Sequence, residues 1–287
     1  MAALSVNTNY GALVALQQLN KTSMDLATTQ NRINTGLKVA GAKDNGAVYS
    51  IAQSMRADHK SLDAAMNSVN MGKSVLEVTV SSLEAVSDLL VEMKQKAVAA
   101  SDATLTVAQR TAYQNDYNEL RTQITTIVNN ASFNGINLLN DDAATNLMEI
   151  LTNPDGTDAN NMTVSGIDVV PGSAGGTMAT LVAGAWTNAT TGAADALASV
   201  AIVDGMVDAV NAQLATFGSR AKAVDILGTM LTKIQDALEA GIGNLVDADM
   251  AKESAKLQSL QVKQQLGVQA LSIANQSPSI ILSLFRG

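Results

Sequence analysis

Apolar residues recur every seven positions along much of the chain. One row consists of Val48, Met55, Leu62, Val69, Leu76, Leu83, Leu90 and Ala97. A second row, three residues further on, holds Ile51, Ala65, Val86, Met93 and Ala100, with breaks at Asp58, Gly72 and Thr79. Two such rows form the seam of a coiled coil. The pattern predicts one helix of more than about fifty residues, roughly 80 Å long.

Two further heptad runs predict partner helices for this seam, one on each side of residues 140–191. The polar stretch 101–109 allows the chain to reverse between the first and second helices. We expect the three helices to form a bundle that buries their seams. The predicted bundle core is Met55, Leu62, Val69, Leu76, Leu83, Leu90, Tyr113, Leu120, Ile127, Val210, Phe217, Val224 and Leu231.

Both ends of the chain are also heptad-like, which predicts two terminal helices that pair with each other. Glycines at 36, 41, 241 and 243 are predicted to separate these helices from the bundle. The tail "SIANQSPSIILSLFRG" is unusually apolar for a chain end, because chain ends are usually polar and frayed. Such a tail, together with the seams of two terminal helices, is predicted to be buried against other copies of the chain.

The heptads vanish between residues 140 and 191, a segment that contains two of the three prolines. Residues 153–156 are typical of a tight turn, and the alternation in 162–170 predicts a strand. A further turn is expected at Asn134–Gly135. We expect a compact β-containing insert, and expect assembly to tolerate removal of residues 155–176, because the heptad seams remain intact.

The predicted fold class is therefore mainly α, a long antiparallel coiled-coil helix bundle with paired N- and C-terminal helices and a small central β-containing insert. Residues 1–40 and 244–287 are assigned to the two halves of an inner coiled-coil domain. Residues 41–140 and 192–243 are assigned to the bundle, and 141–191 to a small, variable outer insert.

Composition narrows the classes of function. The chain has 287 residues, a formal net charge of −8, one histidine and no cysteine. A single imidazole without cysteines cannot form the usual zinc sites, so we expect no metal, no cofactor and no enzyme activity. The negative charge argues against nucleic-acid binding. No apolar run is long enough for a membrane span, and the first residues lack the basic region of a cleaved secretory signal.

Several separated motifs resemble those of bacterial flagellins. Residues 32–58, "RINTGLKVAGAKDNGAVYSIAQSMRAD", are similar to the N-terminal flagellin signature, and 133–139, "FNGINLL", to the F-N-G turn. Residues 245–287 contain D-A-D, Q-Q-x-G, A-N-Q-x-P and L-S-L-F-R, as in the C-terminal signature. The resemblance implies a structural subunit that self-assembles into the extracellular flagellar filament used for swimming, and that is exported through a type III channel.

The resemblance also implies an assembly interface and partners. In flagellins the terminal helices form an inner coiled coil, so the expected self-assembly residues are Leu16, Leu19, Leu26, Ile33, Leu37, Leu257, Leu260, Leu271, Ile281, Leu284 and Phe285. The implied partners are other copies of the chain, the flagellar export apparatus and an export chaperone, the filament cap and hook–filament junction proteins, and sibling flagellins.

Two finer expectations concern the surface. Many flagellins are sensed by a Toll-like receptor through an Arg and a Leu on the long bundle helix, but the matching positions here hold Glu92 and Lys96, beside a retained acidic Asp116. We expect weak receptor activation; the alternative is that Glu92 and Lys96 simply form a solvated i,i+4 pair. Many flagellins also carry O-linked sugars, for which the candidate acceptors are Thr177, Thr180, Thr187, Thr190 and Thr191.

Three alternatives stay open at this point. A hook–filament junction protein shares the terminal helices, a type III-secreted helical translocator shares the export route, and a cytoplasmic signalling coiled coil shares the heptads. The complete C-terminal run and the small insert favour the repeating filament subunit. A translocator would normally contain a long uninterrupted apolar segment.

Overall fold

The computed structural model describes residues 8–140, 147–153, 161–173, 175–181, 183–184, 186, 188 and 190–284, excluding the side chains of 277–284. The chain divides into two compact units, Met1–His59 with Asp236–Gly287, and Lys60–Gln235. The boundary falls inside two helices of 55 residues each, α2 (Gly46–Ala100) and α4 (Gly192–Val246). The domain limits drawn from the sequence stay a prediction.

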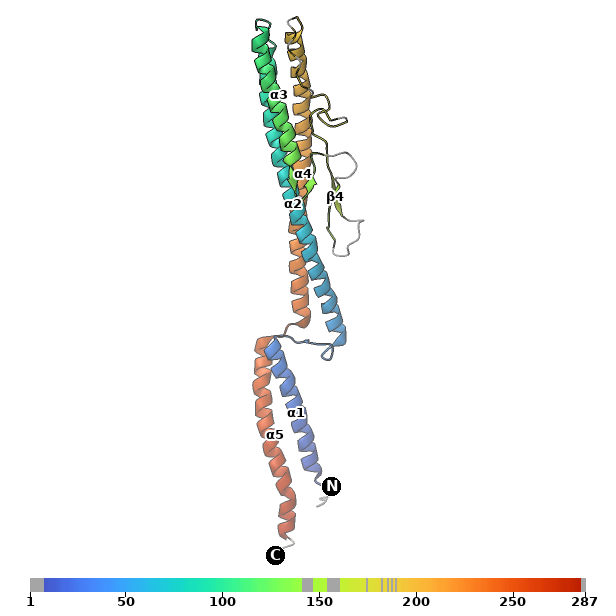
Figure 1. Ribbon diagram of the computed structural model, residues 1–287. Helices are drawn as coiled ribbons and strands as arrows, with labels where there is room; N and C mark the ends of the chain where they lie inside the picture. The colour runs from blue at the N-terminus through green and yellow to red at the C-terminus, as the bar shows by residue number, and fades with distance from the viewer. Residues whose placement is uncertain are drawn as a thin grey trace. The chain divides into compact units, whose positions relative to one another are not determined.

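In the unit Lys60–Gln235, α2 and α4 pack with the shorter α3 (Val107–Asn130), as the heptad runs predict (Figure 1). The helix α3 begins in a capping box, in which Thr106 Oγ1 accepts from the Gln109 amide and Gln109 Oε1 accepts from the Thr106 amide. The buried Arg110 donates through Nε to the carbonyl of Ala100 at 3.0 Å and so satisfies the end of α2. The reversal between the helices is therefore tied at both ends.

The bundle core follows the heptads. Ten of the predicted core residues are buried, namely Leu62, Val69, Leu76, Leu83, Leu90, Leu120, Val210, Phe217, Val224 and Leu231. Tyr113 and Ile127 are half-buried, because α3 turns its neighbouring row of Tyr117, Ile124 and Val128 inward instead. Met55 is half-buried and belongs to the other unit.

Two breaks in the second heptad row have packing explanations. Thr79 is buried, and its hydroxyl donates to the carbonyl of Val75 at 2.8 Å, so no polar group is left unsatisfied. At Gly72 an added Cβ would lie 2.5 Å from Cδ1 of Ile150, so the missing side chain makes room for the insert. Any larger residue at position 72 would collide with Ile150.

The segment after α3 begins with a two-residue hairpin of β1 (Ser132–Phe133) and β2 (Ile136–Asn137). Asn134 and Gly135 both have positive φ, 51° and 82°, as a type I′ turn requires. The turn predicted at these two residues is confirmed. Next, β3 (Leu147–Ile150) pairs antiparallel with β4 (Met162–Ser165). The expected strand at 162–170 is thus shorter than its alternation suggests, and the sequence pattern did not predict β3. The turn expected at 153–156 falls mostly outside the described residues.

The insert contributes to the hydrophobic core, contrary to the expectation that it is only an outer segment. Met148, Ile150 and Val164 of the hairpin are buried, and so are Val169 and Trp186 further along. The Trp186 ring lies 4.8 Å from the ring of Tyr117, between centroids. Because Val164 and Val169 lie within 155–176, removing that segment is now expected to cost stability.

Polar side chains of α3 bind the end of the insert, at Leu181, Gly184 and Trp186, and so hold it against the bundle. Gln114 donates to the carbonyl of Gly184 at 2.5 Å and accepts from the Trp186 amide at 3.0 Å. Asn118 accepts from the Gly184 amide, and Arg121 donates to the carbonyl of Leu181. These residues lie one helical turn apart on one face of α3, so they satisfy backbone groups at the described positions 181, 184 and 186, which belong to no strand.

In the other unit, α1 (Tyr10–Thr35) lies antiparallel beside α5 (Met250–Leu284) (Figure 1). The Asn9 side chain caps α1 by accepting from the Ala12 amide, and Gly36, with φ of 72°, ends it. The predicted break at Gly36 is confirmed. The expected breaks at Gly241 and Gly243 are wrong, because α4 continues through both to Val246.

The continuation of α4 through Gly241 is explained by packing against α2. A side chain at Gly241 would approach Cε of Met55 to 2.7 Å, so close packing on α2 offsets the cost of about 1 kcal/mol for a helical glycine. The chain leaves the helix only at Asp247–Asp249. There the connection between α1 and α2 is joined to the connection between α4 and α5. The Lys38 amide donates to the carbonyl of Val246, and the Ala248 amide donates to the carbonyl of Gly36.

Candidate assembly surface

The seam between α1 and α5 is narrow and partly polar. Among the described side chains, those buried on α1 are Thr22 and Thr29, and those buried on α5 are Glu253 and Leu260. The structure places the remaining predicted assembly residues as follows. Leu19, Leu26, Ile33, Leu37, Leu257 and Leu271 are half-buried, and Leu16 is 44% exposed. The side chains of Ile281 and Leu284, and all of Phe285, lie outside the described residues.

Both helices keep large apolar side chains exposed beyond the seam. On α1 these residues are Tyr10, Leu13, Val14, Leu16 and Met24, and on α5 they are Met250, Val262, Leu266, Val268 and Ile273. Ile273 is 70% exposed and Tyr10 78%. Val262, Leu266 and Ile273 lie at spacings of four and seven, which places them on one face of α5. Contiguous exposed apolar residues of this kind mark interaction surfaces.

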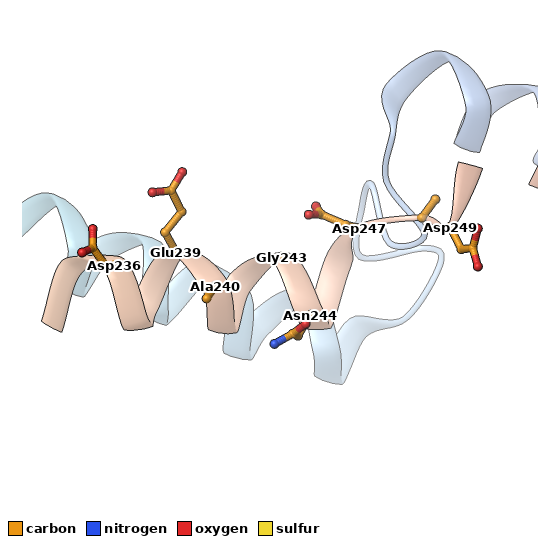
Figure 2. Close-up of a pocket in the computed structure, with 8 residues that line it drawn as sticks. Asp236, Glu239, Ala240, Gly243, Asn244, Asp247 and Asp249 are labelled. Atoms are coloured by element: carbon orange, nitrogen blue, oxygen red, sulfur yellow. The ribbon is translucent and has the colours of Figure 1, made fainter. Parts of the chain in front are cut away.

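A cavity of about 630 Å³ lies beside the last turns of α4 (Figure 2). Four carboxylates line it, from Asp236, Glu239, Asp247 and Asp249. Asp249 has a structural task, because its carboxylate accepts from the Lys252 amide and caps α5. Within the described part of the chain, no three His, Cys, Asp or Glu residues are grouped so that they could hold a metal ion. Within the described residues, the carboxylates of this cavity are therefore not grouped as metal ligands.

Of the helices that the structure describes, none joins the length and the apolar character that a transmembrane segment needs.

The predicted receptor patch lies on α2 and α3. Lys96 Nζ donates to Asp116 Oδ2 at 2.7 Å, so Lys96 bridges the two helices, whereas the alternative expected it to pair with Glu92. The hydrogen bond that Lys96 donates to the Asp116 carboxylate raises the pKa of Lys96 above its usual value. Glu92 is exposed. The weak receptor activation expected from this patch stays a prediction.

The candidate sugar acceptors are distributed unevenly. Thr180, Thr190 and Thr191 are exposed, and Thr177 is half-buried. Thr191 donates to the carboxylate of Asp195 near the start of α4. Thr187 lies outside the described residues. Accessible hydroxyls are present, but their modification stays a prediction.

Sequence reasoning missed the charged contact inside the terminal seam. Arg32 Nη1 donates to Glu253 Oε1 at 3.1 Å, and only 8% of Glu253 is exposed. A signal was available, because Glu253 interrupts the heptad row of Leu260, Gly267 and Ala274. An acidic residue at a seam position predicts a basic partner on the opposite helix.

Comparisons with known proteins agree on one family. Residues 6–144 match the bacterial flagellin N-terminal helical region, and residues 200–285 match the C-terminal helical region. The chain is 46% identical to flagellin FljM of Caulobacter vibrioides, with all of both chains covered. It is 36% identical to a flagellin of Brucella melitensis, with 99% of each covered.

A solved structure supports the helical fold. A Vibrio parahaemolyticus structure assigned to a flagellar hook-associated protein superposes with a TM-score of 0.58. The match covers 71% of this chain and 100% of that one at 15% sequence identity. At this identity the similarity concerns the fold alone.

Proposed function

Because the chain belongs to the bacterial flagellin family, we propose that it polymerises through the outward apolar faces of α1 and α5 and through its C-terminal tail. As a flagellin, it is a structural subunit of the flagellar filament, and the hook–filament junction alternative is not favoured. The finer proposals concern how the subunits meet, how they are exported and what else they contact.

The observation that carries the proposal is the exposed apolar surface of the terminal helices. A pair of helices buries one stripe on each partner, yet α1 and α5 carry large apolar residues on a second face. Covering these residues in a neighbouring subunit removes them from water, at about 25 cal/mol per Å² of apolar area. Heterologous contacts of this kind need not close, so they can propagate as a filament.

Export and further contacts complete the proposal. The subunit leaves the cell through the flagellar type III apparatus, with an export chaperone, and adds to an extracellular filament. There it contacts the filament cap, hook–filament junction proteins and sibling flagellins. Membership of the flagellin family supports this export route and these partners.

Seeded growth tests the central proposal. Purified full-length chain is concentrated with short filament seeds and imaged by electron microscopy, and we expect the seeds to elongate. The matched variant replaces Leu266 and Ile273 on the outward face of α5 with Gln. It should fold and melt like the original chain but add to seeds much more slowly. Equal elongation by both proteins would contradict assembly through this face.

The Glu92–Lys96 patch supports a second proposal, that the monomer is a weak agonist of the Toll-like flagellin receptor. A surface shaped for a cation would meet the Glu92 carboxylate, and like-charge contacts can cost several kcal/mol. In a receptor reporter assay, Glu92→Arg with Lys96→Leu should signal more strongly than the original chain. Strong signalling by the original chain would refute this proposal.

A third proposal is that the exposed threonines of the insert carry O-linked sugars. Intact mass spectrometry of filament protein from the native cell should exceed the mass of the bare chain. A mass equal to the bare chain would exclude modification at Thr177, Thr180, Thr187, Thr190 and Thr191.

A further inference from the structure

The interface between α1 and α5 holds an ion pair at a position where a coiled coil normally holds apolar residues. Arg32 reaches across from α1 to Glu253 near the start of α5, and Thr29, one turn earlier on α1, is completely buried. We propose that the Arg32–Glu253 pair fixes the register in which α1 and α5 pair. If the chain assembles as proposed above, on which this step rests, the register also determines which residues each subunit presents to its neighbours in the filament.

Three contacts define that register. The Asn9 side chain donates to the carbonyl of Ala274 at 2.6 Å at one end of the pair, and Arg32 binds Glu253 at the other. Between them, Leu19 lies against Gly267, where an added Cβ would come within 3.2 Å of Leu19 Cδ1. Residues that advance along α1 therefore meet residues that recede along α5, in one antiparallel alignment.

Heptad spacing alone does not select this alignment. A shift by seven residues returns every seam position to an equivalent position on the facing helix. The two buried residues of α1, Thr22 and Thr29, are themselves seven apart and chemically the same.

The backbone hydrogen bonds from Lys38 to Val246 and from Ala248 to Gly36 hold one end of the pair. Along the helices themselves, only features that differ between heptads can discriminate the native alignment from its neighbours. A polar residue at a single seam position is the best attested device for this purpose.

The charges penalise both shifts. Asp25 lies seven residues before Arg32, so a shift in one direction places the Asp25 carboxylate opposite Glu253. Leu260 lies seven residues after Glu253, so a shift in the other direction places Arg32 opposite an apolar side chain. The first alignment brings like charges together, and the second leaves a guanidinium without its carboxylate. Of the three alignments, only the native one places Arg32 opposite Glu253.

The second oxygen of Glu253, Oε2, and the Arg32 Nε are buried without a hydrogen-bond partner among the described residues. The ion pair therefore leaves buried polar atoms without hydrogen bonds, which is unfavourable if its only role is to stabilise the helix pair. Replacing a buried ion pair with apolar residues is often neutral or favourable for stability, whereas removing one partner is costly. Replacing both residues with apolar ones therefore distinguishes a register role from a purely stabilising role. If the pair sets the register, the apolar variant should still pair α1 with α5, but in more than one alignment.

The absence of native cysteines allows register to be read by disulfide formation. A Cβ at Gly267 would lie 3.9 Å from the Leu19 Cβ, within the range that a disulfide spans. Leu19→Cys with Gly267→Cys thus reports the native register. Leu19→Cys with Leu260→Cys, and Leu19→Cys with Ala274→Cys, report the two shifted registers. Each pair is introduced into the full-length chain and oxidised both as monomer and in filaments, and intramolecular cross-links are measured.

The reporters are then combined with changes at the ion pair. Arg32→Leu with Glu253→Leu should raise the ratio of shifted to native cross-links by at least about tenfold, which corresponds to 1.4 kcal/mol. The charge swap Arg32→Glu with Glu253→Arg should return the ratio to that of the original chain. Lys21→Leu with Lys256→Leu, two exposed positions on the same helices, is the matched control and should leave the ratio unchanged.

The outcomes separate the register from assembly. Electron microscopy scores filament growth independently, so failed polymerisation would count against the proposed function and leave the monomer cross-links interpretable. The register proposal is overturned if the double leucine variant keeps the original cross-link ratio. It is also overturned if the charge swap behaves like the double leucine variant, or if the original chain gives shifted cross-links as readily as native ones.

Discussion

The terminal helix pair and the three-helix bundle are both built from heptads, but they bury very different side chains. In the bundle, Leu83 and Leu90 of α2, Ile124 of α3 and Val224 of α4 are completely buried. On α1 the buried residues are two threonines, and on α5 an ion-paired glutamate accompanies Leu260. The same periodicity thus supports a self-sufficient core in one region and an incomplete one in the other.

The difference teaches that heptad spacing reports which face is covered, and side-chain identity reports how much that covering stabilises. Two helices, α3 and α4, cover the α2 seam, and salt bridges such as Lys73–Asp225 and Lys94–Asp204 join α2 to α4 at 2.7 and 2.6 Å. A lone pair of helices leaves each partner largely exposed. We infer that α1 and α5 reach full stability only when neighbouring subunits cover their outer faces.

The largest expected effect is on assembly. Ile281→Asp with Leu284→Asp should abolish polymerisation while leaving the bundle folded, because burying an unpaired carboxylate costs several kcal/mol. Electron microscopy measures filaments, and circular dichroism melting measures the bundle. Normal filaments from this variant would show that the tail is not a buried contact.

Hydrogen exchange should separate the two regions in the monomer. Amides of α1 and of residues 250–276 are expected to exchange about a thousandfold faster than those of buried bundle positions, because local opening there disrupts little apolar packing. In filaments both regions should be protected. Terminal helices that are equally protected in monomer and filament would contradict their dependence on neighbours.

Truncating leucines should sharpen the contrast in stability. Leu83→Ala leaves a cavity in the bundle and should lower the free energy of unfolding by about 2–5 kcal/mol. Leu16→Ala on α1, where the side chain is exposed, should change it by less than about 0.5 kcal/mol. Urea denaturation of the monomer measures both. Similar losses from the two variants would mean that α1 contributes to the monomer core.

A pair of glycines tests whether the insert is part of the bundle. Gly72→Ala forces Ile150 to move and should destabilise the monomer by about 1–3 kcal/mol. Gly205 of α4 has open space around it, so Gly205→Ala should instead stabilise by about 0.5–1 kcal/mol through helix propensity. Thermal melting compares them. If Gly72→Ala stabilises as much as Gly205→Ala, the insert does not pack on α2 as described.

A pH-dependent loss of stability from Tyr117 is expected only above about pH 10. Burial raises the pKa of Tyr117 to about 12, above the value near 10 of an unfolded tyrosine. The neutral phenol is therefore favoured in the fold, and its contribution to stability is complete below about pH 10 and lost between about pH 10 and 12. Tyr117→Phe should lose less stability over this interval than the original chain. Parallel alkaline denaturation curves for the two proteins would contradict the raised pKa.

By itself, the sequence determined the features that depend on neighbours along the chain. The heptads through Leu62–Leu90 predict α2 because an amphipathic helix repeats its buried face locally. Asn134–Gly135 predicts its turn because both residues tolerate positive φ. The motifs around Arg32 and in 245–287 indicate the flagellin family because they depend only on the order of residues along the chain.

Only the tertiary structure decided the features that depend on residues distant in the chain. Gly241 stays helical because Met55 packs against it, and β3 forms because Met162–Ser165 supplies its hydrogen bonds. Glu253 is tolerated in a buried seam because Arg32, 221 positions earlier, reaches its carboxylate. Local pattern gives each of these residues a preference of about 1 kcal/mol. Removing one partner of a buried pair costs about 3–5 kcal/mol, so the distant contacts prevail.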